Sequence, residues 1–105
     1  MSEKISVVIP VYNSENSLLE LYQKLVKSLD EITNNFEIIM VDDHSKDQSY
    51  KQILQLHQKD NRVKAIKLAE NFGQQNAIIC GFNFVKGDYI VTMDDDLQHQ
   101  PEDII

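Results

Sequence analysis

Four short apolar runs, separated by longer stretches with helical periodicity, most constrain what this chain can fold into. The runs are nearly continuous and rich in β-branched residues, as in strands that are buried on both faces of a parallel sheet. They occupy residues 5–12, 36–41, 62–68 and 88–93. Strands that alternate with helices in this way predict an α/β fold, with a parallel sheet and right-handed crossovers.

Each of the three intervening stretches carries an apolar stripe that we expect to face the sheet. The three stripes comprise Leu18, Leu19, Tyr22, Leu25, Val26, Leu29 and Ile32; Tyr50, Ile53, Leu54 and His57; and Ala77, Ile78, Gly81, Phe82 and Val85. Asp47 or Ser45 is the expected N-cap of the second helix. Gly81 would allow close approach to the sheet, and Gly87 suits the position just after the third helix.

The third run differs from the others because two lysines interrupt it. Lys64 and Lys67 make it the best candidate for an edge strand. The chain has 105 residues, which is at most one domain, and it ends soon after the fourth run without a closing helix. We therefore expect residues 1–105 to be the N-terminal part of a single, larger domain.

The charge balance excludes one class of function. With 17 acidic and 10 basic residues the net charge is −7, whereas nucleic-acid binding needs a basic surface, so we expect no nucleic-acid partner. Cys80 is the only cysteine, so no intrachain disulfide can form and a reducing compartment is expected. The first residues lack a secretory pattern, and no apolar run reaches the roughly 18 residues of a membrane span. These observations predict a soluble, cytoplasmic chain.

Polar clusters follow three of the four predicted strands. They are residues 12–14, 42–44 and 94–96. Because the carboxyl ends of parallel strands lie on the same rim of a sheet, these clusters should converge where open α/β sheets bind ligands. For the 42–44 cluster taken alone, a solvated loop or a helix cap explains the acids equally well.

Three adjacent carboxylates at positions 94–96 repel one another unless a cation lies between them. Mg²⁺ and Mn²⁺ prefer oxygen ligands, and Gln98 could add a neutral oxygen. Neither of the glycine-rich phosphate-binding motifs, G-x-G-x-x-G and G-x-x-x-x-G-K-[ST], occurs in the chain. We therefore expect a bound metal ion to hold any phosphate. An EF-hand starting at Asp94 is excluded, because its sixth and twelfth positions are His99 and Ile105.

A response-regulator receiver domain is the alternative reading of the acids. The stretch IIMVDDHS is similar to the acidic pair of that family, with Asp94 as the phosphoacceptor. Receivers, however, carry the pair after their first strand, and here it follows the second.

Four motifs in order, VVIPVYN, IIMVDDHSKD, NFGQQNAIICGF and GDYIVTMDDDLQHQPEDI, resemble the family 2 glycosyltransferases. The most similar branch is that of the polyprenyl-phosphate sugar transferases, which includes dolichol-phosphate mannosyltransferases and bactoprenol glucosyltransferases. The resemblance implies a Rossmann-like GT-A fold with strand order 3-2-1-4. It further implies transfer of a sugar from a UDP- or GDP-sugar to polyprenyl phosphate at the cytoplasmic face of a membrane. Residues 1–105 would hold the donor and metal half, and alone would be inactive.

The resemblance also assigns site residues by position. The nucleotide-sugar-binding positions are Pro10, Tyr12, Val41, Asp43, Asp94 and Asp95, of which the last two lie at the donor's ribose and diphosphate. Asp96 and Gln98 match the ligands of Mg²⁺ or Mn²⁺. Asp42 is expected to support its loop. No residue matches a catalytic base, which the resemblance places beyond Ile105.

The chain departs from the family pattern at four positions. Ser14 stands where Glu is frequent, His44 where Gly is common, Glu70 where a basic residue is frequent, and Asp95 where Ala is common. The His44 replacement should alter the turn after the second strand.

A fourth strand without a further neighbour also has an unpaired edge, so we expect the 105-residue chain to self-associate.

Overall fold

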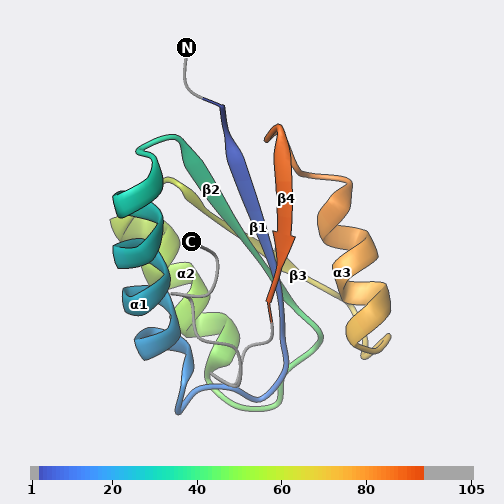
Figure 1. Cartoon of the computed structure of the whole chain (residues 1–105). Coiled ribbons are helices and arrows are strands. Elements are labelled where there is room, and N and C mark those ends of the chain that lie inside the picture. Colours follow the sequence, from blue (N-terminus) through green and yellow to red (C-terminus); the bar gives the residue numbers. More distant parts are fainter. Residues whose placement is uncertain (1–2, 94–105) are drawn as a thin grey trace.

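A computed structural model describes residues 3–93 as an alternation of strands and helices (Figure 1). In chain order the elements are β1 (Ile5–Val11), α1 (Leu18–Ile32), β2 (Phe36–Asp42), α2 (Ser49–Lys59), β3 (Val63–Lys67), α3 (Gln74–Phe82) and β4 (Tyr89–Thr92). The predicted α/β class and all seven elements are confirmed, and each strand boundary differs by no more than two residues from the prediction.

The four strands form a single parallel sheet in the order β3-β2-β1-β4, as expected. Strand β1 is central: Ile5 to Val11 pair with Phe36 to Asp42 on one side. On its other side, Ile5 to Val8 pair with Tyr89 to Thr92. Strand β3 lies at an edge, where its two lysines meet solvent at lower cost than they would in the middle of the sheet.

Helices cover both faces of the sheet, with α1 and α2 on one side and α3 on the other (Figure 1). The larger core lies under α1 and α2 and includes Val7, Ile9, Leu21, Leu25, Ile38 and Met40, all fully buried. The smaller core, under α3, contains Val8, Ile39, Val41 and Ala77. Burying each such side chain contributes roughly 1.5–3 kcal/mol before conformational entropy is counted.

Helix α1 buries a narrower stripe than its sequence suggests. Leu18, Leu21, Leu25 and Leu29 are fully buried, and Tyr22 and Val26 pack partly against them. The prediction that Leu19 and Ile32 face the sheet is wrong, since they are 53% and 43% exposed. Leu19 lies about 100° around the helix from the buried Leu18, beyond the arc that touches the strands, whereas Ile32 is the last residue of the helix.

The other two helices also bury narrower stripes than the sequence predicts. Helix α2 packs through Ile53 and Leu56, while Leu54 is 37% exposed. Helix α3 packs through Ala77 and Gly81, while its last residue, Phe82, is 42% exposed. The predicted stripe of α2 also included His57, which is exposed, and that of α3 included Val85, which lies beyond the end of the helix.

Gly81 permits the close approach of α3 to the sheet, as predicted. A Cβ atom there would lie 2.5 Å from Val8 Cγ1 and 3.2 Å from Val41 Cγ2. The predicted role of Gly87 is wrong, because α3 ends earlier with Asn83 as its C-cap. Gly87 instead packs against β1, where a Cβ atom would lie 2.4 Å from Ser6 Oγ.

The start of α2 differs slightly from the prediction. The N-cap is Gln48 rather than Asp47 or Ser45, and its side chain makes no capping bond. Asp47, one residue earlier, nevertheless accepts a hydrogen bond from the Ser49 backbone N–H at its Oδ1, at 2.9 Å. Asp47 therefore satisfies one of the free N–H groups that begin the helix.

A charged cluster at the amino-terminal end of the sheet was not foreseen from the sequence. Asp60 accepts hydrogen bonds from Arg62 Nε at 2.9 Å and from the Tyr22 hydroxyl at 2.7 Å. The Arg62 guanidinium also lies 4.2 Å from the ring centroid of Phe36 and 3.5 Å from Asp30 Oδ1. This cluster joins α1 to the turn between α2 and β3.

Candidate functional site

Three hydrogen bonds tie the loop after β1 to the loop and first turn that follow β2, and the Asp43 N–H donates to the Val11 carbonyl at 2.8 Å. Ser45 Oγ accepts from the Asn13 N–H at 3.0 Å, and Asn13 Oδ1 accepts from the Lys46 N–H at 2.8 Å. Ser49 Oγ accepts from the Ser14 N–H at 2.7 Å. The predicted convergence of the polar clusters that follow these two strands is confirmed. The third cluster, residues 94–96, lies outside the described residues.

Two residues in these loops have left-handed backbone conformations. Asn13 has φ 51° and His44 has φ 60°. Asn tolerates this region, whereas other side chains cost roughly 1–2 kcal/mol there. The turn therefore explains why glycine suits the position of His44. His44 itself adopts the left-handed conformation.

Asp42 supports the loop, as expected. It is fully buried, and its Oδ2 accepts a hydrogen bond from the Ser45 N–H at 3.0 Å. Its second oxygen, Oδ1, is buried without a hydrogen-bond partner among the residues that the structure describes. The buried carboxylate thus holds the first turn of the β2–α2 loop.

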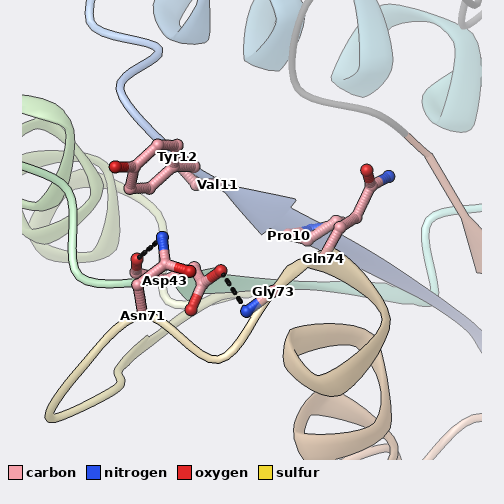
Figure 2. A pocket seen from close by; sticks show the side chains of 7 residues that line it. All are labelled: Pro10, Val11, Tyr12, Asp43, Asn71, Gly73 and Gln74. Atoms are coloured by element: carbon pink, nitrogen blue, oxygen red, sulfur yellow. Dashed lines mark hydrogen bonds between the residues drawn. The ribbon is translucent and has the colours of Figure 1, made fainter.

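A cavity of about 320 Å³ opens at the carboxyl ends of β1 and β2 (Figure 2). This volume is within the roughly 300–1,000 Å³ range of small-molecule sites. Its lining residues are Pro10, Val11, Tyr12, Asp43, Asn71, Gly73 and Gln74. They come from the end of β1, the end of β2 and the loop that leads into α3. We call this cavity the rim pocket.

Asp43 shapes one wall of the rim pocket. Its carboxylate is almost fully buried, and it accepts hydrogen bonds from the Phe72 N–H at 2.8 Å and the Gly73 N–H at 2.9 Å. Its backbone carbonyl accepts from Asn71 Nδ2 at 3.4 Å, as drawn in Figure 2. Gly73 has φ 94°, which a residue with a side chain rarely adopts. Asp43 therefore fixes the 71–73 loop and still has lone pairs for a ligand.

Pro10 stops the pairing of β1 with β4. Met93 N–H donates to the Val8 carbonyl at 3.2 Å, so the next β1 residue that faces β4 is Pro10. Proline has no N–H to continue the ladder. Among the described residues, Val8 and Thr92 are the last pair of these two strands. This is also the point where strand order reverses, where open α/β sheets bind ligands.

The first residue of α3 also faces the rim pocket. Gln74 begins the helix, and Gly73 is its N-cap without a side-chain capping bond. The first turn of α3 itself carries no acidic residue, but the Asp43 carboxylate accepts from the N–H of the N-cap Gly73 at 2.9 Å. The pocket thus combines the amino-terminal end of α3 with one carboxylate, that of Asp43.

The structure brings together three of the eight predicted site residues: Pro10, Tyr12 and Asp43 all line the rim pocket. Val41 is fully buried in the smaller core and is not among the lining residues. The other four, Asp94, Asp95, Asp96 and Gln98, lie outside the described residues. Within residues 3–93, no group of three or more acidic, histidine or cysteine side chains could hold a metal ion.

Sequence reasoning missed Asn71, Gly73 and Gln74 as pocket residues. Their signal was present, because they belong to the NFGQQN stretch, which was used only as a family motif. A glycine before a helix, in a loop on the ligand-binding side of the sheet, is a reason to assign such a loop to a site.

A family model described as Glycosyl transferase family 2 matches residues 6–105. The chain is 47% identical over 102 residues to the undecaprenyl-phosphate 4-deoxy-4-formamido-L-arabinose transferase of Proteus mirabilis. It is 46% identical over 103 residues to the protein of the same name from Photorhabdus laumondii. The matches cover 96% and 97% of this chain, but the chain spans less than a third of those relatives.

Solved structures give the same picture of the fold. S. aureus TarS 1-349 in complex with UDP-GlcNAc has a TM-score of 0.74 and 30% identity, and the match covers 89% of this chain and 26% of that one. The mannosyltransferase PcManGT from Pyrobaculum calidifontis, solved with GDP-Man and Mn²⁺, has a TM-score of 0.80 and 18% identity, with 91% and 28% covered. The predicted GT-A fold is confirmed.

The receiver-domain alternative has no support. The acidic pair Asp42 and Asp43 ends the second strand, not the first, and the comparisons lead to a different family.

A further finding concerns membranes: none of the three helices within residues 3–93 has the length and apolar character that a bilayer span requires.

Proposed function

The chain belongs to glycosyl transferase family 2, and we propose that it is the donor-binding part of a polyprenyl-phosphate sugar transferase. The enzyme would move a sugar from a UDP- or GDP-sugar to a polyprenyl phosphate at the cytoplasmic face of a membrane. Two relatives whose names specify undecaprenyl phosphate support this acceptor class. Residues 1–105 would form the N-terminal part of one GT-A domain and would not catalyse transfer alone, because positioning of the acceptor supplies much of the rate.

The observation that carries the proposal is the rim pocket. Pro10, Tyr12 and Asp43, which the family resemblance assigns to the nucleotide, line a single cavity although they come from two strands. The solved TarS structure with UDP-GlcNAc, which shares the fold at 30% identity, supports a nucleotide sugar as the ligand class.

Each lining residue suits a part of a nucleotide. Tyr12 is 42% exposed and lines the cavity, so its ring would offer a face on which a base stacks. Asp43 would accept a hydrogen bond from the base or the ribose with the lone pairs that Phe72 and Gly73 leave free. The first turn of α3 would face the diphosphate, whose charge the helix dipole favours. Asp94 and Asp95 would complete the site at the ribose and diphosphate.

A divalent ion, Mg²⁺ or Mn²⁺, would reduce the repulsion between the acidic chain and the diphosphate. Asp96 and Gln98 would hold it, because carboxylate and amide oxygens are the ligands that these ions prefer. The bound ion would stabilise the nucleoside diphosphate as the leaving group.

Calorimetric titration of the 105-residue chain with UDP and with GDP tests the proposal. We expect one nucleotide to bind more tightly with Mn²⁺ than in EDTA. Replacing Tyr12 with alanine should weaken binding about tenfold or more, since base stacking contributes roughly 1–3 kcal/mol. The matched control is Phe82→Ala, because Phe82 is also 42% exposed and lies at the end of α3 remote from the pocket. No binding, or equal losses in the two variants, would contradict the assignment.

We also propose that the chain self-associates through the outer edge of β4. Tyr89 and Ile90 are 54% and 48% exposed, and within residues 3–93 β4 pairs with β1 alone. An open apolar edge favours association. Light scattering over a dilution series should show a mass that falls with concentration, whereas a monomer at every concentration would refute this proposal.

A further inference from the structure

The outer edge of β3 presents unpaired backbone groups. The Arg62 carbonyl accepts from the Ile38 N–H at 2.8 Å, and the Leu68 N–H donates to the Asp42 carbonyl at 2.9 Å. Residues at even positions in this stretch therefore bond to β2. Because alternate residues of a parallel strand bond to opposite sides, Val63, Ala65 and Lys67 turn their N–H and C=O groups away from the sheet.

Two of these outward groups, both of Val63, are already satisfied. The Val63 N–H donates to the Asp60 carbonyl at 3.0 Å. His57 Nδ1 lies 2.6 Å from the Val63 carbonyl oxygen, and since that oxygen can only accept, Nδ1 carries the proton. Ala65 and Lys67 have no such partner within the part of the chain that the structure describes. An added strand could therefore pair with the N–H and C=O groups of Ala65 and Lys67, but not with Val63, whose carbonyl is bonded to His57.

A groove of about 470 Å³ runs along this edge. Its lining residues are Glu37, Leu54, His57, Lys64, Ala65, Ile66, Phe84 and Lys86. The first wall, on the α2 side of the sheet, is formed by Leu54, His57 and Ala65. The second wall, on the α3 side, is formed by Lys64, Ile66, Phe84 and Lys86. Alternate side chains of an added strand would contact one wall and then the other.

The two walls differ in chemistry. Leu54 is 37% exposed and forms an apolar contact surface beside Ala65 on the first wall. The second wall carries Lys64 and Lys86. The Lys64 ammonium donates one hydrogen bond, to the Asn61 carbonyl at 3.1 Å, and has two further N–H groups. Glu37 does not neutralise the two lysines in the groove: it is 2% exposed and accepts from Ser6 Oγ at 2.6 Å and the Lys86 N–H at 2.7 Å. It also lies 3.9 Å from Lys4 Nζ.

From these features we propose that the β3 edge binds an extended peptide in which aliphatic and acidic residues alternate. The aliphatic side chains lie against Leu54 and Ala65, and the acidic ones pair with Lys64 and Lys86. A second copy of the same edge is disfavoured, because Lys64 and Lys67 would meet their own counterparts. The groove shares no lining residue with the rim pocket, so this inference does not depend on the proposed function.

The test uses the isotope-labelled 105-residue chain and a blocked synthetic peptide of about six alternating valine and acidic residues, a typical strand length. Amide exchange at Ala65 and Lys67 should slow when the peptide is added. Affinity should fall about tenfold in the Lys64→Glu, Lys86→Glu double variant, because two attractive pairs become repulsive. Lys51→Glu is the control, since Lys51 is exposed on α2 and does not line the groove.

Two further measurements address the backbone contact. Replacing Ala65 with proline removes an outward N–H and leaves the bonds to β2 intact, so peptide binding should be lost while the fold remains. If that variant does not fold, a peptide methylated on alternate backbone nitrogens serves instead, and it should not bind. Peptide-induced changes away from β3, or unchanged affinity for the methylated peptide, would overturn the proposal. Protection of Ala65 that rises with protein concentration alone would overturn it in favour of a second copy.

Discussion

Replacing Asp60 with asparagine should destabilise the protein by an amount that depends on pH. The Asp60 carboxylate accepts hydrogen bonds from Arg62 Nε, at 2.9 Å, from a second guanidinium nitrogen at 3.0 Å and from the Tyr22 hydroxyl at 2.7 Å. The bonds from Arg62, followed by the one from Tyr22, lower the pKa of Asp60 from 3.8 to about 2, against the opposing effect of burial. Asparagine keeps the shape but removes the charge.

The size of the effect follows from that pKa. Each pH unit by which a pKa is lowered corresponds to about 1.4 kcal/mol, so the change from 3.8 to about 2 corresponds to about 2.4 kcal/mol. The Arg62 side chain is 33% exposed, and solvent screens the pair, so we expect about 1–2 kcal/mol. Because the folded pKa is the lower one, the stabilisation is present above pH 3.8 and is lost as the pH falls toward 2.

Urea denaturation of the wild type and of Asp60→Asn at several pH values between 7 and 2.5 measures this directly. The difference in unfolding free energy should be largest at pH 7 and should shrink as the pH approaches 2.5. Asp30→Asn is the control, because Asp30 is 52% exposed and contacts Arg62 at 3.5 Å; we expect it to cost less than about 0.5 kcal/mol. A difference that is the same at both ends of the range would refute the role assigned to the charge.

Three other predictions concern single positions. Alkaline pH should weaken the same cluster, because burial, followed by the hydrogen bond to Asp60, raises the pKa of Tyr22 from 10 to about 12. The stabilisation by Tyr22 is therefore present below pH 10 and is lost as the pH rises through 12. Thermal melts of the wild type and of Tyr22→Phe over this pH range would show the loss. His44→Gly should stabilise the protein by about 1 kcal/mol because φ is 60° there, and a lower melting temperature would contradict this. Gly81→Ala should cost about 1–3 kcal/mol, since the new Cβ would lie 2.5 Å from Val8 Cγ1, and an unchanged urea midpoint would contradict this.

The order of the elements could be predicted because the pattern that encodes it is local. Buried parallel strands leave continuous apolar runs, and Lys64 and Lys67 mark the strand that sits at the edge. The limits of each buried helix face could not be predicted. Leu19 and Ile32 are apolar, yet whether a strand lies opposite them depends on how the helix is placed on the sheet.

Polar contacts between residues that are distant in the sequence could not be predicted either. Tyr22 and Asp60 are separated by 38 positions, so no local pattern joins them. The 71–73 loop, which forms one wall of the rim pocket, could not be predicted for the same reason: Asp43, which holds it, lies about 30 positions away in the sequence. Pro10, Tyr12 and Asp43 could be assigned to one rim because the carboxyl ends of parallel strands must meet there.

The central claim is that the rim pocket binds the nucleotide of a sugar donor. The most direct test maps amide chemical shifts of the labelled chain during titration with UDP and with GDP in the presence of Mg²⁺, which does not broaden the signals. The account predicts that the largest changes occur at Tyr12, Asp43, Gly73 and Gln74, which line the cavity. It also predicts that Asp43→Asn reduces these changes, because the loop that Asp43 holds would loosen. Changes confined to other parts of the chain, or none with either nucleotide, would contradict it.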